Sequence, residues 1–96
     1  MCTSITHQAK IYGRGKQGEE WIDLKEANVS YDHPYGMPLE HALNIDFVDE
    51  SKGPGARVAV ELSVEAARQL IKTIEAVLAQ AEHQGVLEDK HQAAAS

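Results

Sequence analysis

The chain has 96 residues and a mass of 10.5 kDa, a length at which one domain is expected. Nine basic against fifteen acidic residues give a net charge of −6. This charge argues against a general nucleic-acid or anionic-membrane binder, because such proteins need a positive field.

The remaining composition points to a globular protein of the cytoplasm. Apolar residues make up 43% of the chain and charged residues 25%. The single cysteine, Cys2, excludes an internal disulfide framework and a zinc module built from several cysteines. No apolar run approaches the roughly 20 residues of a membrane span, and the N-terminus lacks a signal-type hydrophobic region. We therefore expect a cytoplasmic protein with no membrane partner.

Alternation of apolar and polar residues predicts four β-strands. The segments with this period of two are Ile5–Tyr12, Ala27–His33, His41–Val48 and Ala56–Leu62. Trp21–Leu24 is also apolar, but its phase does not continue into the next strand, so we expect a bulge or bend near Lys25–Glu26. Glycine and proline mark two connecting loops, Pro34–Glu40 and Asp49–Gly55.

A helix is predicted near the C-terminus. From Val64 to Ala81 the apolar residues recur at spacings of three and four, which places them in one stripe on a helix. Gly85 follows as a C-terminal helix stop, so the helix is expected over residues 64–83. Residues 1–85 then form a single α+β domain, and residues 86–96 a disordered tail.

The predicted fold is α+β: a four-stranded antiparallel β-meander followed by one long C-terminal amphipathic helix packed on one face. One helix is about 10 Å wide, whereas four strands span about 19 Å, so part of the apolar face stays uncovered. A small domain with such a surplus usually completes its core with a second copy. We therefore expect self-association, most simply as a homodimer.

The strand register brings histidines together. Pairing Tyr31 with Leu43 keeps the apolar residues on one face and sets His33 opposite His41 on the core side. Facing imidazoles can share a divalent ion such as Zn²⁺, with a third ligand from His7, Cys2 or Glu40. The alternative is a hydrogen-bonded histidine pair at the end of the sheet.

The same register gathers polar residues on the other face. It sets Ser30 against Asn44 and Asn28 against Asp46, with Arg57 and Glu61 diagonal to Asp46. Such a set is typical of a solvated strand surface. The functional alternative is a site for a small polar ligand, or for acid–base chemistry, whose residues are Asn44, Asp46, Arg57 and Glu61.

Two further motifs point to structure more than to chemistry. Gly13–Gly18 matches G-x-G-x-x-G, but a strand and two acidic residues follow it instead of a helix, so we interpret it as a hairpin loop. The aromatic residues Trp21, Tyr31 and Phe47 are scattered over several strands without interleaved basic residues, which favours the core over a base-stacking platform.

Several stretches resemble a known family. They are Met1-Cys2-Thr3, Val29-Ser-Tyr-Asp-His-Pro34, Glu40-His-Ala-Leu-Asn-Ile-Asp-Phe47 and Gly53-Pro-Gly-Ala-Arg-Val-Ala-Val-Glu-Leu62. The chain resembles a family of small uncharacterised bacterial proteins, a domain of unknown function. The resemblance covers most of residues 1–83, implies a bacterial cytoplasmic origin, and carries no activity, cofactor or catalytic residue with it.

Three classes of function follow from these observations. The first is a non-catalytic homo-oligomeric binding or interaction module. The second is a metal-binding protein, or a small metal-dependent enzyme, that uses His33 and His41 with His7 or Cys2. The third is a metal-free enzyme that uses Asp46 and Arg57. The fold alone does not decide between them, because one sheet can host unrelated activities.

Overall fold

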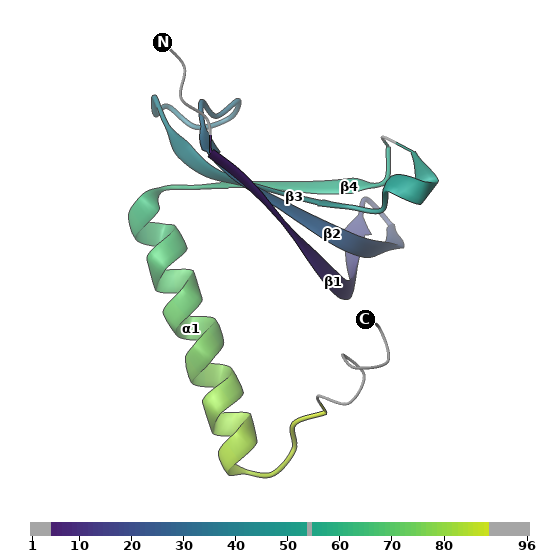
Figure 1. Cartoon of the computed structure of the whole chain (residues 1–96), viewed down its shortest axis with the longest axis vertical. Helices are drawn as coiled ribbons and strands as arrows, with labels where there is room; N and C mark the ends of the chain where they lie inside the picture. Colours follow the sequence, from purple (N-terminus) through teal and green to yellow (C-terminus); the bar gives the residue numbers. More distant parts are fainter. Residues whose placement is uncertain (1–4, 54, 89–96) are drawn as a thin grey trace. The chain divides into compact units, whose positions relative to one another are not determined.

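The computed structural model describes residues 5–53 and 55–88. Contacts divide the chain into two compact units, one that ends at Ser63 and one that begins at Val64. The first unit is a sheet and the second contains a helix (Figure 1). The elements in chain order are β1 (Ile5–Gln17), β2 (Glu20–Asp32), β3 (Ala42–Val48), the 3₁₀ turn η1 (Glu50–Lys52), β4 (Arg57–Leu62) and α1 (Val64–His83).

The sheet is antiparallel with strand order β1-β2-β3-β4, which confirms the predicted α+β meander. The predicted register is confirmed in both central pairs. Tyr31 lies opposite Leu43, and Leu43 lies opposite Leu62. Because strand side chains alternate between faces, this register gives the sheet one apolar face and one polar face. We use "polar face" below for the face that carries Asn28, Ser30, Asn44, Asp46, Arg57 and Glu61.

The first hairpin is longer than the sequence indicates. β1 continues through the glycine-rich segment to Gln17, so only Gly18 and Glu19 form the turn. The expected hairpin loop over Gly13–Gly18 is therefore wrong in extent. Gly18 takes a φ of +63°, which favours glycine at a tight turn.

A bulge bends this hairpin at the predicted position. Lys10 pairs with Glu26 and Gly13 with Leu24, so two residues of β1 lie opposite Lys25 alone. Beyond this point β1 turns sharply, as Figure 1 shows at its lower right. The extra residue belongs to β1, whereas the sequence placed the irregularity on the neighbouring strand.

The bend carries the end of β1 to the other edge strand. The amide Nε2 of Gln17 donates to the carbonyl oxygens of Gly55 and Arg57 at 2.8 and 3.2 Å. An ideal Cβ on Gly15 would lie 2.8 Å from Leu24 Cδ1 and 3.2 Å from Val58 Cγ2. Edge strands β1 and β4 therefore meet at one end of a curled sheet, and only glycine fits at position 15 without displacing its neighbours.

Helix α1 begins and ends as the periodicity predicts. Its end is a Schellman motif, in which Val86 N donates to Ala81 O and Gly85 N to Glu82 O, both at 3.0 Å. Gly85 takes a φ of +74°, as this motif requires. Among the described residues, no helix is both long and apolar enough to cross a membrane.

One aromatic residue departs from its expected place. Tyr31 and Phe47 are half-buried on the apolar face, but Trp21 is 58% exposed on the bent end of the hairpin. The core prediction for Trp21 is therefore wrong. Leu24, Ala27 and Ala42 are among the buried apolar residues that the structure describes in the sheet unit.

Candidate ligand pocket

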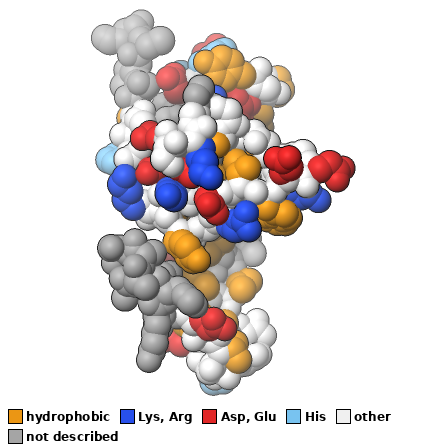
Figure 2. Space-filling view, turned by 90° about the vertical axis from the view of Figure 1, so that its right-hand side faces the viewer, with side chains coloured by type: hydrophobic (Ala, Val, Ile, Leu, Met, Phe, Trp, Pro, Cys, Tyr) orange, Lys and Arg blue, Asp and Glu red, His pale blue; other side chains and the backbone are white. Residues whose placement is uncertain are grey.

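The polar face has the register that the sequence predicts. Asn28 lies opposite Asp46, which in turn lies opposite Ala59. In the next row Ser30 lies opposite Asn44. Figure 2 shows charged side chains of both signs interspersed over the sheet unit. The face is therefore a mixed polar surface on which specific groups are held side by side.

A pocket of about 330 Å³ opens on the polar face, next to the connection between β3 and β4. Its floor comes from the strands and its wall from that connection. The lining residues are Asn28, Asp46, Val48, Glu50, Gly53, Ala56 and Arg57. Two of the four predicted ligand-binding residues, Asp46 and Arg57, thus share one concave site with the predicted polar-face residue Asn28.

An ion pair stands in the pocket. Arg57 Nη2 donates to Asp46 Oδ1 at 2.6 Å, from a position diagonal to it on the neighbouring strand. The two side chains are 51% and 39% exposed. A pair this open to water is weakly held, because solvent screens the attraction between the charges. Both groups can therefore exchange part of their mutual bonding for a ligand.

The wall of the pocket is organised by Asp49, which is only 1% exposed. Its Oδ1 accepts from Ser51 Oγ at 2.6 Å and from Ser51 N at 3.1 Å, which caps η1. These bonds, the hydroxyl first, lower the pKa of the Asp49 carboxyl, against the opposing effect of burial. Asp49 N also donates to Ala56 O at 3.2 Å, which closes the connection.

The other two predicted ligand-binding residues form hydrogen bonds with backbone groups outside the pocket. Glu61 accepts two backbone N–H groups, from Tyr35 at 2.7 Å and from Gly36 at 2.8 Å. These bonds lower the pKa of the Glu61 carboxyl. The amide of Asn44 donates to Asp32 O at 3.4 Å. Neither residue lines the pocket, and Glu61 holds the loop between β2 and β3 against the polar face.

The predicted metal ligands are distributed differently from the expectation. The β2–β3 ladder ends at Asp32 and Ala42, one pair before His33 and His41, and both histidines are exposed. Both histidines therefore lie just outside the ladder and are open to solvent. His33 Nδ1 lies 3.2 Å from Glu40 O, and the His41 ring stacks on Tyr31 with centroids 5.5 Å apart.

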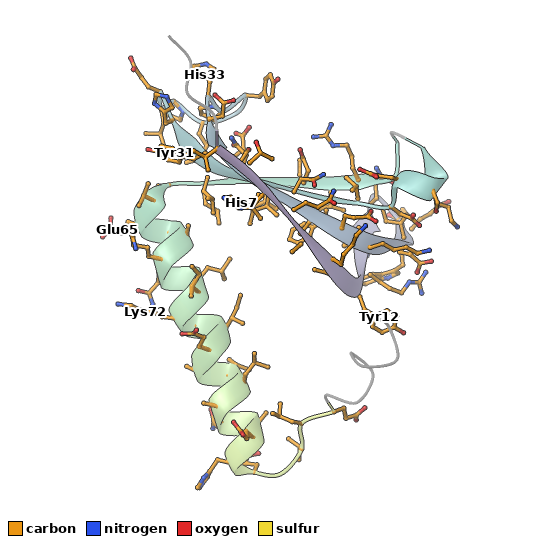
Figure 3. All side chains as sticks on the ribbon, viewed as in Figure 1. His7, Tyr12, Tyr31, His33, Glu65 and Lys72 are labelled. Carbon is orange, nitrogen blue, oxygen red and sulfur yellow. The ribbon has the colours of Figure 1, made fainter. Side chains whose placement is uncertain are left out.

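Of the proposed third ligands, His7 lies apart from this pair. His7 pairs with Val29, four residues before His33, which corresponds to about 13 Å along an extended strand. Figure 3 shows the labelled residues His7 and His33 at different places along the sheet. Cys2 lies outside the described residues. Within residues 5–53 and 55–88, no group of three or more histidine, cysteine, aspartate or glutamate side chains is placed to hold a metal.

Sequence reasoning missed much of the pocket. Val48 alternates in phase with the residues of the polar face. Because its side chain is apolar, the sequence does not predict it as part of the histidine cluster or of the polar ligand site. Glu50, Gly53 and Ala56 come from the connection between strands, whose path the sequence does not specify. Glycine and proline in Asp49–Gly55 mark a turn, but not the side of the sheet on which it forms a wall.

An open four-stranded antiparallel sheet followed by one helix, with a pocket on the polar face, defines a small α+β protein. The chain belongs to a family of unknown function, DUF6295, whose model matches residues 1–87. This confirms the resemblance to an uncharacterised family. No curated protein and no solved structure matches the chain significantly.

Proposed function

We propose that this protein is a small, non-catalytic binding module that takes a polar solute in the polar-face pocket and associates with a second copy of itself. The observation that carries the binding role is the half-exposed pair of Asp46 and Arg57 in a pocket of about 330 Å³. A concave site with a few convergent polar groups is the usual form of a ligand site.

The pocket supports binding because its polar groups are positioned before a ligand arrives. Asp46 and Arg57 stand on neighbouring strands, and the buried Asp49 fixes the connection that forms the wall. Groups held by strands and by a closed loop lose little freedom on binding, so more of the interaction energy appears as affinity.

A thermal-shift screen tests the binding role. Amines, carboxylates, amino acids, sugars and phosphates are each added to the full chain at millimolar concentration. A solute that binds the folded state raises the melting temperature. The proposal predicts that at least one class does so, that Arg57→Gln reduces the rise, and that Arg68→Gln, at an exposed arginine of α1, preserves it. No rise with any class, or an equal rise in Arg57→Gln, contradicts the proposal.

The apolar stripe of α1 supports self-association. Its large apolar side chains are 43–59% exposed: Leu70, Ile71, Ile74, Val77 and Leu78. Apolar positions 67, 70, 74, 77 and 81 alternate in steps of three and four, the spacing with which two helices pack side by side. A second copy offers an identical stripe for this packing.

Sedimentation velocity over a range of protein concentrations tests self-association. The proposal predicts a dimer that dissociates on dilution. Ile74→Lys, which places a charge in the middle of the stripe, should give a monomer with an unchanged circular-dichroism spectrum, whereas Lys72→Gln on the polar side should leave the dimer intact. A wild-type chain that stays monomeric at high concentration contradicts this part of the proposal.

A further inference from the structure

The pocket presents opposite charges side by side, which restricts the chemistry of its ligand. We infer that the ligand is a small zwitterion of the α-amino-acid class, an inference that rests on the proposed binding role of the pocket. Asp46 Oδ1 and Arg57 Nη2 lie 2.6 Å apart and are both partly exposed. An α-amino acid carries its ammonium and carboxylate groups on one carbon, so it can present both charges at this spacing.

The ammonium group of such a zwitterion can bind to hydrogen-bond acceptors that line the pocket. Asp46 uses Oδ1 for Arg57, which leaves its Oδ2 to accept a ligand N–H. Glu50 adds a second carboxylate on the rim. The neighbouring Glu26 lies outside the lining, and its Oε2 is paired with Lys10 Nζ at 3.3 Å. The two carboxylates of the lining, Asp46 and Glu50, favour a cationic donor on this side.

The carboxylate group of the zwitterion can bind to the guanidinium group of Arg57. Arginine has five N–H donors in a planar fork that matches a carboxylate. In the described part of the chain, the guanidinium donates through Nη2 to Asp46. The other N–H groups of Arg57 therefore remain to bind a ligand carboxylate, while Asp46 holds the ammonium group.

Charge and size favour a zwitterion over an ion of one sign. The charged lining residues are two carboxylates, Asp46 and Glu50, and one guanidinium, Arg57. A simple anion would approach both carboxylates, and a simple cation would compete with Arg57 for Asp46, so each meets a repulsive neighbour. Val48 and Ala56 supply apolar lining, and a volume of about 330 Å³ suits a ligand with a short aliphatic side chain.

Titrations of the full chain followed by ¹H–¹⁵N spectra test this inference. The probes are glycine and L-valine as zwitterions, isobutylamine as the matched amine, and isobutyrate as the matched carboxylate. We expect saturable shifts at pocket amides with a zwitterion, and affinities about tenfold or more weaker for the two half-ligands. Asp46→Asn and Arg57→Gln should each weaken zwitterion binding by about the same factor.

Asp23→Asn is the matched control, because Asp23 also belongs to an exposed ion pair, with Arg14 at 3.2 Å, outside the pocket. It should leave the affinity unchanged. If isobutylamine or isobutyrate binds in the pocket as tightly as either zwitterion, the inference is wrong while the proposed binding role stands. If none of the four probes binds and the thermal-shift screen also finds no ligand, both are wrong. If another class of solute binds while both zwitterions fail, the inference alone is wrong.

Discussion

The carboxylate of Glu61 receives the backbone N–H of Tyr35 at 2.7 Å, across 26 residues of chain. Its other oxygen receives the N–H of Gly36 at 2.8 Å. The side chain of Tyr35 is itself fully exposed. A single carboxylate on β4 thus anchors the backbone of the loop between β2 and β3, with both of its oxygens in use.

Removal of this carboxylate should release the loop. In Glu61→Ala both amides lose their acceptor, so hydrogen exchange at Tyr35 and Gly36 is expected to accelerate by about tenfold or more, with little change in the centres of the strands. Glu75→Ala, which removes an exposed carboxylate from α1, serves as the control and should leave these rates unchanged. Unaltered exchange at both amides in Glu61→Ala contradicts the anchoring role.

The Glu61 contacts should also make stability depend on pH. The bonds from Tyr35 and Gly36 lower the pKa of Glu61 in the folded chain below its unfolded value of about 4.5. The folded state therefore gains stability above that pH and loses it as pH falls through the lowered pKa. Denaturant unfolding of wild type and Glu61→Gln from pH 7 to pH 3 should show a stability difference that shrinks toward acid. A difference that grows toward acid has the wrong sign.

A side chain at Gly15 should destabilise the fold. A Cβ there would meet Leu24 Cδ1 at 2.8 Å and Val58 Cγ2 at 3.2 Å, so Gly15→Ala should lower the free energy of unfolding by about 1–3 kcal/mol. Gly13→Ala is the matched control, because a Cβ on Gly13 meets nothing within 4 Å. Its effect should stay within about 0.5 kcal/mol. Equal effects of the two substitutions in urea unfolding would show that the hairpin does not curl onto β4.

Gln17 should hold the curled edge together. Gln17→Ala removes the bonds to Gly55 O and Arg57 O and should cost about 1 kcal/mol, with faster amide exchange around the start of β4. Gln8→Ala removes an exposed bond to Asn28 at 2.8 Å on the body of the sheet. This control should leave exchange at the start of β4 unchanged. Exchange that is insensitive to Gln17→Ala argues against contact between the two edges.

The strand pairing could be predicted because burial fixes it. A slip by one residue would turn Val29, Tyr31 and Ile45 toward the polar face, so apolar alternation selects one register. The same argument placed Asp46 beside Asn28 and diagonal to Arg57, and these three residues line the pocket. The part of the site that lies on paired strands was therefore accessible from sequence.

The remaining features depend on contacts that no local pattern reveals. Glycines disfavour strands, so local propensity does not predict that β1 continues through Gly13 and Gly15. The close approach of Gly15 to Leu24 and Val58 follows from the fold of the whole sheet. Glu61 alternates like any solvent-facing residue, and its use by a distant loop follows from the path of that loop. The pocket wall depends on the buried Asp49, which resembles an ordinary loop aspartate in the sequence.

Mapping of ligand-induced amide shifts tests the central claim most directly. The claim is that the pocket beside Asp46 and Arg57 is the binding site of this protein. A titration with the solute that gives the largest thermal shift should move the amides of Asn28, Val48 and Arg57 in a saturable manner, and Arg57→Gln should weaken this binding by about tenfold or more. Saturable shifts confined to the loop over Pro34–Glu40 or to α1, with the pocket amides unmoved, would contradict the account.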